Sequence, residues 1–260
     1  MLRRSLKMAF WIWYDYMGGW FLINFILLIP LFSFFTIFLV MMDKLPELTY
    51  PIFFSVPFLY LFISHTFVAN CVSLIIDRKE SLLKSLLPSF KKTFSKKASV
   101  GLEFFVLLSL IGYSGFLSTR FSVLISPYLT MFIGVIILWC LMLVLICFMW
   151  IIPSLAWKEL PVFKYLRWGF VLTLSNPGFT FIVCVCYTIF LALNFIPIYS
   201  LSWGLVYPAI FLASAYEIMY RKYEALRSGG NLSDWQIYRD REDEFLNRGF
   251  IHILRPWEMK

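Results

Sequence analysis

Long runs without a charged residue are the feature that most constrains this chain. No Asp, Glu, Lys or Arg occurs among the 27 residues between Asp15 and Asp43, or among the 29 between Glu47 and Asp77. A hydrocarbon core about 30 Å thick needs roughly 20 residues of α-helix. Each run therefore predicts one membrane-spanning helix, at residues 20–42 and 52–76.

Two longer uncharged runs have to be divided before they can be counted. In the 37-residue run 121–157, Pro127 and Pro153 bracket an interior without turn residues, so we expect one helix at 128–152 with its ends at these prolines. The 49-residue run 168–216 is broken by Asn176-Pro177-Gly178, with Asn176 as a helix cap, and again by Asn194 and Pro197. This second run predicts two spans, at 178–196 and 200–219.

Residues 98–119 contain a single acid, Glu103, and complete a set of six predicted spans. The basic residues test this number, because 21 of the 23 Lys and Arg would then share one side of the membrane: 3 before the first span, 7 in 78–97, 3 in 158–167 and 8 from 221 onward. Cytoplasmic loops carry the excess of Lys and Arg, so we expect both termini in the cytoplasm. If 121–157 were a hairpin of two spans, the asymmetry would collapse.

Composition supports a membrane protein and argues against other classes. A content of 61% apolar residues, with 20% aromatic residues and a mean hydropathy of +0.79, excludes a water-soluble globular domain. The net charge of +8 lies beside the spans, which favours anionic phospholipid headgroups over nucleic acid. We therefore expect an all-α polytopic membrane protein, with six transmembrane helices in residues 1–223 and a cytoplasmic tail in residues 224–260.

Amphipathic helices are predicted to lie in the membrane interface on the cytoplasmic side. Residues 79–97 and 162–175 both repeat apolar residues at helical spacing, and Pro88 is expected to kink or divide the first of them. The segment 2–14, with Trp11 and Trp13, is expected to be an aromatic and basic anchor. The basic residues expected to meet anionic lipid or a partner are Lys84, Lys91, Lys92, Lys96, Lys97, Lys164 and Arg167. These segments serve either as anchored connectors or as a docking surface.

Polar residues within the spans are the remaining candidates for chemistry, because ionisable groups are costly in hydrocarbon. Asn24, Asn70 and Glu103 are predicted at similar depth near the cytoplasmic side, with His65 closer to the middle of its span. One hypothesis is a cavity open to the cytoplasm, in which Glu103 binds a cation or exchanges a proton with His65. The alternative is that the asparagines join helices by hydrogen bonds.

No set of residues predicts an enzyme, a metal site or a cofactor. The chain holds two histidines, and all five cysteines (Cys71, Cys140, Cys147, Cys184 and Cys186) fall within predicted spans, where cysteine packs as a small apolar residue. Catalysis would need a nucleophile with its base, a metal set or paired acids. We therefore expect a non-enzymatic protein without a cofactor.

The tail ends in a segment too apolar for a disordered region. We expect it to dock through Phe245, Phe250, Leu254 and Trp257, either on this chain or on another protein.

Three short motifs carry a resemblance to a known family. They are Tyr14-Asp15-Tyr16-Met17-Gly18 with the following Leu22-Ile23-Asn24-Phe25 and Ile29-Pro30, then Leu86-Leu87-Pro88-Ser89-Phe90-Lys91-Lys92-Thr93-Phe94, and Asn176-Pro177-Gly178. Together they resemble the YesL-like bacterial membrane proteins, a family named for a domain of unknown function. The resemblance implies a compact helical protein of the bacterial inner membrane, associated by gene context with carbohydrate uptake, and it brings no catalytic residues. The tail is longer than the family core requires.

These observations favour an accessory or scaffold membrane subunit that engages a protein partner on the cytoplasmic side. The alternative is a small-solute transporter with a polar cavity facing the cytoplasm. It would need a polar route through the bundle, and the middle of the predicted spans offers little beyond His65.

Overall fold

All regular structure in the described part of the chain is helical. The computed structural model describes residues 1–42, 46–79, 81–94, 100, 103, 106, 127–158, 160, 162–227 and 248. Its elements are α1 (Leu2–Asp15), α2 (Met17–Met42), α3 (Pro46–Arg78), α4 (Leu82–Lys92), α6 (Pro127–Trp157), α7 (Val162–Ser175), α8 (Pro177–Ala192), η2 (Leu193–Phe195), α9 (Pro197–Ser202) and α10 (Val206–Arg227). The predicted all-α class is confirmed for these residues.

Four segments of the described chain are long and apolar enough to cross a membrane. They are Met17–Phe38, Leu59–Arg78, Met131–Trp157 and Pro177–Phe195. Each overlaps one predicted span, so the chain has the helices of a membrane protein. The predicted span at 98–119 lies outside the described residues except for residues 100, 103 and 106.

The region of the sixth predicted span, 200–219, is divided between two helices. The short helix α9 ends at Ser202, and α10 begins at Val206 after a turn in which Gly204 has a φ of +38°. Helix α10 carries Glu217 and Arg221, which shorten its apolar stretch, and it continues beyond residue 223 to Arg227.

Prolines divide these helices less than expected. The run 121–157 contains the single helix α6 rather than a hairpin, but the expected end at Pro153 is wrong, because α6 continues to Trp157. A proline within a membrane helix is tolerated where side chains pair the freed backbone groups. Likewise, α4 runs through Pro88 to Lys92.

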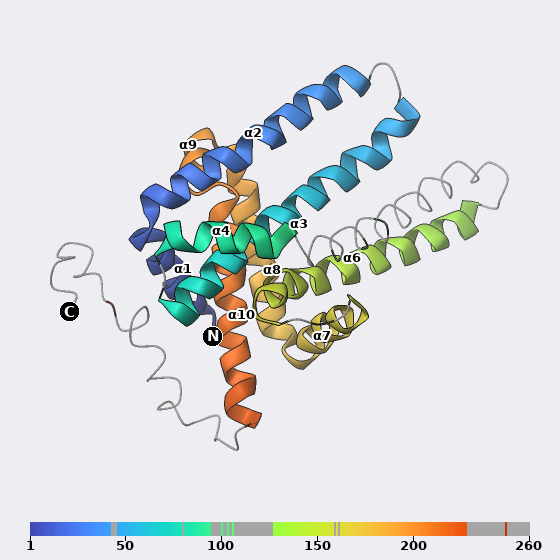
Figure 1. Cartoon of the computed structure of the whole chain (residues 1–260). Coiled ribbons are helices and arrows are strands. Elements are labelled where there is room, and N and C mark those ends of the chain that lie inside the picture. The colour runs from blue at the N-terminus through green and yellow to red at the C-terminus, as the bar shows by residue number, and fades with distance from the viewer. Residues whose placement is uncertain are drawn as a thin grey trace.

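The core lies around α10. The side chains from Leu205 to Met219 are buried on all sides of this helix, which packs against α1, α3, α6 and α8. Figure 1 shows α2 and α3 as a long hairpin with α6 extending in the same direction, whereas α10 runs across them. The outer parts of α2 and α6 expose large apolar side chains, as expected for a surface that faces lipid.

Helix α1 belongs to this core. The side chains of Met8, Trp11, Ile12 and Trp13 are buried against it, and the rings of Trp13 and Trp203 lie 4.9 Å apart. The segment predicted as an interfacial anchor therefore packs on α10 within the described structure.

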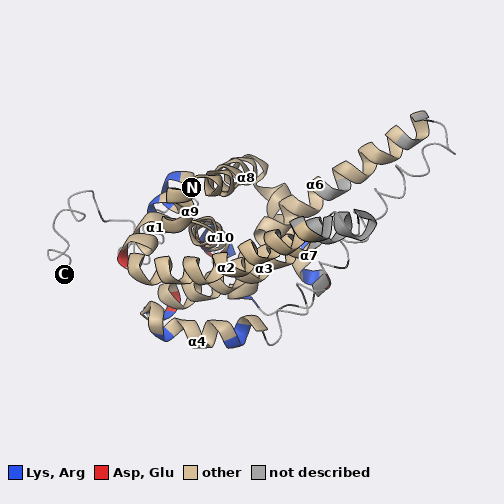
Figure 2. Ribbon diagram, turned by 90° about the horizontal axis from the view of Figure 1, so that it is seen from above, with Lys and Arg blue, Asp and Glu red and all other residues tan. Residues whose placement is uncertain are grey.

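Charged residues are distributed unevenly over the helices. Figure 2 shows Lys and Arg on α1, α4 and α7, while the long arms of α2, α3 and α6 are almost free of charge. The side chains of Lys84 and Lys91 on α4 and of Lys164 and Arg167 on α7 are exposed.

Candidate functional site

Helix α4 presents an apolar surface outward, in addition to the leucines that it packs against the core. Leu83 and Leu87 are 75% and 79% exposed, and Phe90 and Phe94 are about half exposed. We call these four residues the α4 outer face. Leu83, Leu87 and Phe90 follow one another at three- and four-residue spacing, so they share one side of the helix. Phe94 lies just beyond the helix, and its ring centroid is 4.5 Å from that of Phe90. A helix on a water-soluble protein would turn such a stripe toward its core.

The opposite side of α4 carries leucines as well as small polar residues, with Leu82 3% exposed and Leu86 partly buried against the core. Ser85 and Ser89 are fully buried, and Thr93, just beyond the helix, is also buried. Because short side chains allow helices to approach closely, this side can pack tightly on α3. The spacing of four residues between Ser85, Ser89 and Thr93 could have indicated this inner side from the sequence, but it was not recognised.

Two side-chain contacts fix α4 to its neighbours. Asn70 of α3 donates its amide Nδ2 to Thr93 Oγ1 at 2.9 Å, and Lys92 donates Nζ to the Ala156 carbonyl of α6 at 2.8 Å. Lys92 is therefore a structural contact in the described part, whereas Lys84 and Lys91 flank the α4 outer face. Lys96 and Lys97 lie outside the described residues.

Asn24 joins α2 to the turn between α9 and α10. Its Nδ2 donates to the carbonyls of Ser200 and Leu201 at 2.6 and 3.1 Å, and its Oδ1 accepts from the Leu205 amide at 2.9 Å. Helix ends leave such backbone groups without partners. The fully buried Asn24 side chain pairs with both the carbonyls at the end of α9 and the amide before α10, as expected of an asparagine that joins helices.

His65 joins α3 to α8. Its Nε2 lies 3.1 Å from the Tyr187 hydroxyl and its Nδ1 lies 3.3 Å from Ser64 Oγ, with the whole ring buried. A neutral imidazole can accept at one nitrogen and donate at the other. Sequence reasoning missed Tyr187, which is 122 residues away and carries no local signal.

The four predicted polar residues therefore occupy different surroundings. Asn24 contacts the α9–α10 turn, His65 contacts α8, and Asn70 contacts the end of α4. The Glu103 side chain is exposed. The proton exchange proposed between Glu103 and His65 remains a hypothesis.

A cation and four aromatic rings gather where α6, α7 and α10 meet. The Lys158 ammonium lies 3.6 Å from the centroid of the Trp168 ring and 5.2 Å from that of Tyr220. Trp168 Nε1 donates to the Tyr216 hydroxyl at 3.3 Å, and the ring of Trp157 lies 5.4 Å from that of Tyr216. Burial, and secondarily the charge of Arg227, lowers the pKa of Lys158.

The turn between α7 and α8 is attached to the same helix. Asn176 is the residue before α8, as predicted, but its side chain makes no cap bond. Instead its Nδ2 donates to the Tyr223 hydroxyl, and its Oδ1 accepts from Lys222 Nζ at 2.8 Å. The residues that end one helix and start the next thus hold α10 in place.

One residue near the C-terminal end contacts α1. Arg248 Nη1 donates to Asp15 Oδ2 at 2.5 Å, and the guanidinium lies 5.4 Å from the Trp11 ring centroid. Phe245, Phe250, Leu254 and Trp257, predicted to dock the tail, lie outside the described residues.

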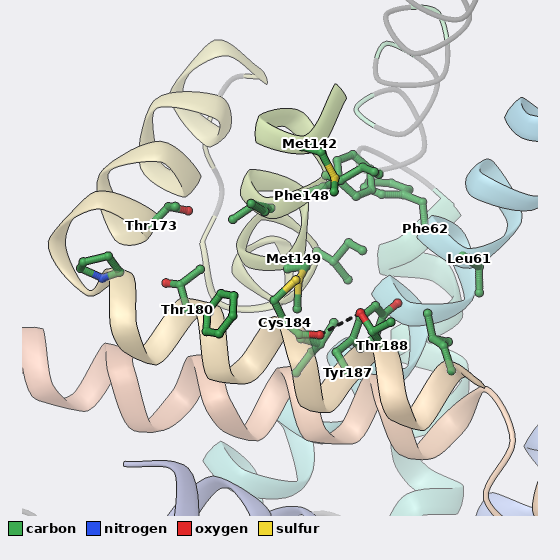
Figure 3. A pocket seen from close by; sticks show the side chains of 17 residues that line it. Leu61, Phe62, Met142, Phe148, Met149, Thr173, Thr180, Cys184, Tyr187 and Thr188 are labelled. Atoms are coloured by element: carbon green, nitrogen blue, oxygen red, sulfur yellow. Dashed lines mark hydrogen bonds between the residues drawn. The ribbon is translucent and has the colours of Figure 1, made fainter. Parts of the chain in front are cut away.

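A cavity of about 710 Å³ lies among α3, α6, α7 and α8. In Figure 3, Thr180, Cys184 and Thr188 of α8 line one side, while Met142, Phe148 and Met149 of α6 lie behind them. The described lining holds no Asp, Glu, Lys or Arg.

Metal-ligating residues do not converge in the described chain, where no three His, Cys, Asp or Glu side chains could hold an ion together. Cys71, Cys147, Cys184 and Cys186 are free thiols. Comparisons with protein-family models, curated proteins and solved structures gave no match. The likeness to the YesL-like family therefore rests on its sequence motifs.

Proposed function

We propose that this chain is a non-enzymatic, multi-pass protein of the bacterial inner membrane that acts as an accessory or scaffold subunit. The α4 outer face carries the proposal, because it exposes four large apolar side chains. Hydrogen bonds to α3 and α6 hold this part of the chain in place. Contiguous exposed apolar surface marks an interaction site.

The charges beside this face suggest where it lies. Lys84 and Lys91 flank the apolar stripe, and basic residues next to a span attract anionic headgroups on the cytoplasmic side. We place both termini in the cytoplasm, in keeping with the 21 basic residues on that side of the six-span topology. The protein partner then approaches from the cytoplasm. A link to carbohydrate uptake rests on the family resemblance.

The described interior favours a scaffold over a small-solute transporter. A solute route needs polar groups that converge near the middle of the membrane. Here Asn24, His65 and Asn70 are each bonded to a neighbouring element, and the cavity beside α8 is lined by apolar side chains and neutral hydroxyls.

Site-specific photocrosslinking in intact cells tests the proposal. A photoreactive residue at Leu83 or Leu87 should yield one discrete larger species that contains a second protein. Leu174 on α7, which is 61% exposed, provides a matched control position and should not yield this species.

The same second protein should co-purify in a fixed ratio in mild detergent. The ratio should fall in the double variant Leu83→Ser/Leu87→Ser but remain unchanged in Leu174→Ser. Crosslinks to lipid alone, together with purification as a monomer without a partner, would refute the scaffold function.

A further inference from the structure

The cavity beside α8 has the shape of a groove. Residues of α8 line it at every third or fourth position from Pro177 to Leu191, a distance of about 21 Å at 1.5 Å per residue. Helix α6 contributes its lining from Met142 to Ile152, or about 15 Å. Leu61 and Phe62 of α3, Thr173 of α7 and Leu212 of α10 complete the lining. The lining therefore extends along most of α8.

The polar groups in the lining are already engaged by the protein. Thr188 Oγ1 donates to the Cys184 carbonyl at 2.9 Å, as Figure 3 shows, and Thr173 Oγ1 donates to the Gly169 carbonyl at 2.9 Å. Thr180 Oγ1 accepts from Trp150 Nε1 at 3.1 Å, and the Tyr187 hydroxyl pairs with His65. A polar ligand would lose its bonds to water here and find few replacements. The groove therefore suits a hydrocarbon.

The groove opens where lipid tails are found. Helices α6 and α8, which form its two long sides, both contain a candidate membrane span. Four lining residues are exposed and mark the open side, namely Met142, Pro177, Phe181 and Thr188. One leaflet of a hydrocarbon core is about 15 Å deep, half of the roughly 30 Å thickness. The groove is thus long enough for one lipid chain.

We propose that this groove binds one acyl chain of a membrane phospholipid, laid along α8 between α6 and α3. A void lined by apolar atoms lacks dispersion contacts on its open side, and a hydrocarbon chain supplies them. A volume of about 710 Å³ lies in the range of roughly 300–1,000 Å³ typical of ligand pockets. The chain is held by contact along its length, while the headgroup remains in the interface.

Photolabelling of the full-length protein in lipid nanodiscs tests this site. The probe is a phosphatidylethanolamine that carries a diazirine near the end of one acyl chain. Labelled residues, mapped by mass spectrometry, should concentrate in 142–152 and 177–191. Equal labelling of exposed residues on the outer part of α6, such as Phe132 and Ile136, would overturn the proposal.

Two variants on adjacent residues provide the matched comparison. Thr188→Trp places a bulky ring in the groove, whereas Ile189→Trp adds the same ring at an exposed position outside the lining. Labelling of the groove should fall severalfold in Thr188→Trp and stay unchanged in Ile189→Trp. Equal labelling in the two variants would argue against the site.

A measurement on the wild-type protein does not require that any variant folds correctly. Protein extracted from membranes without added lipid should retain one phospholipid per chain in native mass spectrometry. Retention of free fatty acid or detergent alone would overturn the assignment to a phospholipid.

Discussion

Replacing Asn24 by alanine should destabilise the protein strongly without changing its surface. The side chain is fully buried and joins α2 to the turn before α10. Its amide donates to the Ser200 and Leu201 carbonyls, and its oxygen accepts from the Leu205 amide. Alanine can make none of these bonds, and a neighbouring side chain would have to move to replace them.

The cost can be worked out from these three contacts. A buried polar group left without a partner costs about 1–3 kcal/mol. The Leu205 amide and at least one of the two carbonyls lose their partner, so the free energy of unfolding should fall by about 2–6 kcal/mol. At about 2–4 °C per kcal/mol for a chain of this size, the melting temperature should fall by roughly 10 °C.

The measurement is thermal unfolding of purified protein in mild detergent. The readout is the fraction of protein that remains monodisperse after heating. Asn194 provides a matched control, because among the described residues its Nδ2 donates to the Phe190 carbonyl, four residues earlier in the chain, and its Oδ1 has no partner. Asn194→Ala should therefore cost less than about 1 kcal/mol. Equal melting temperatures for the two variants, or an Asn24→Ala protein as stable as the wild type, would refute the role assigned to Asn24.

Four further changes test other parts of the structure. Gly204→Ala should reduce the thermal stability and yield of monodisperse protein, because φ is +38° and a Cβ atom would lie 2.0 Å from Asn24 Oδ1. Lys158→Gln should lower the free energy of unfolding by about 1 kcal/mol through loss of the cation–π contact with Trp168, whereas Lys158→Arg should retain most of it in the same assay. Glu103→Gln should leave yield and thermal stability unchanged, because the side chain is exposed; lost assembly would assign it a structural role. Removal of residues 228–260, after the end of α10, should leave the protein partner bound through the α4 outer face in co-purification, and release of that partner would place its binding on the tail.

Sequence patterns were most informative about elements that depend on local chemistry. The four candidate spans overlap predicted spans, and α7 coincides with the predicted helix at 162–175. Asn176 and Pro177 stand at the start of α8 as expected. These features follow from hydropathy and from the backbone properties of proline and asparagine, which act over a few residues.

The candidate site depended on contacts that no local pattern contains. In α4, Leu82, Ser85 and Ser89 are buried while Leu83 and Leu87 face outward, and this choice between leucines depends on the helices against which α4 packs. His65 meets Tyr187 only because α3 packs near α8.

By itself, the sequence determined that this chain is helical, that it belongs in a membrane and where four of its apolar helices lie. The cause is that a bilayer requires uncharged helices of sufficient length. Tertiary structure alone decided that α1 packs on α10, that α6 continues through Pro153 and that Asn24 joins elements 176 residues apart. Those outcomes depend on which helix surfaces pack together. Hydropathy is the same for many arrangements of these helices, whereas close packing of their side chains differs between them.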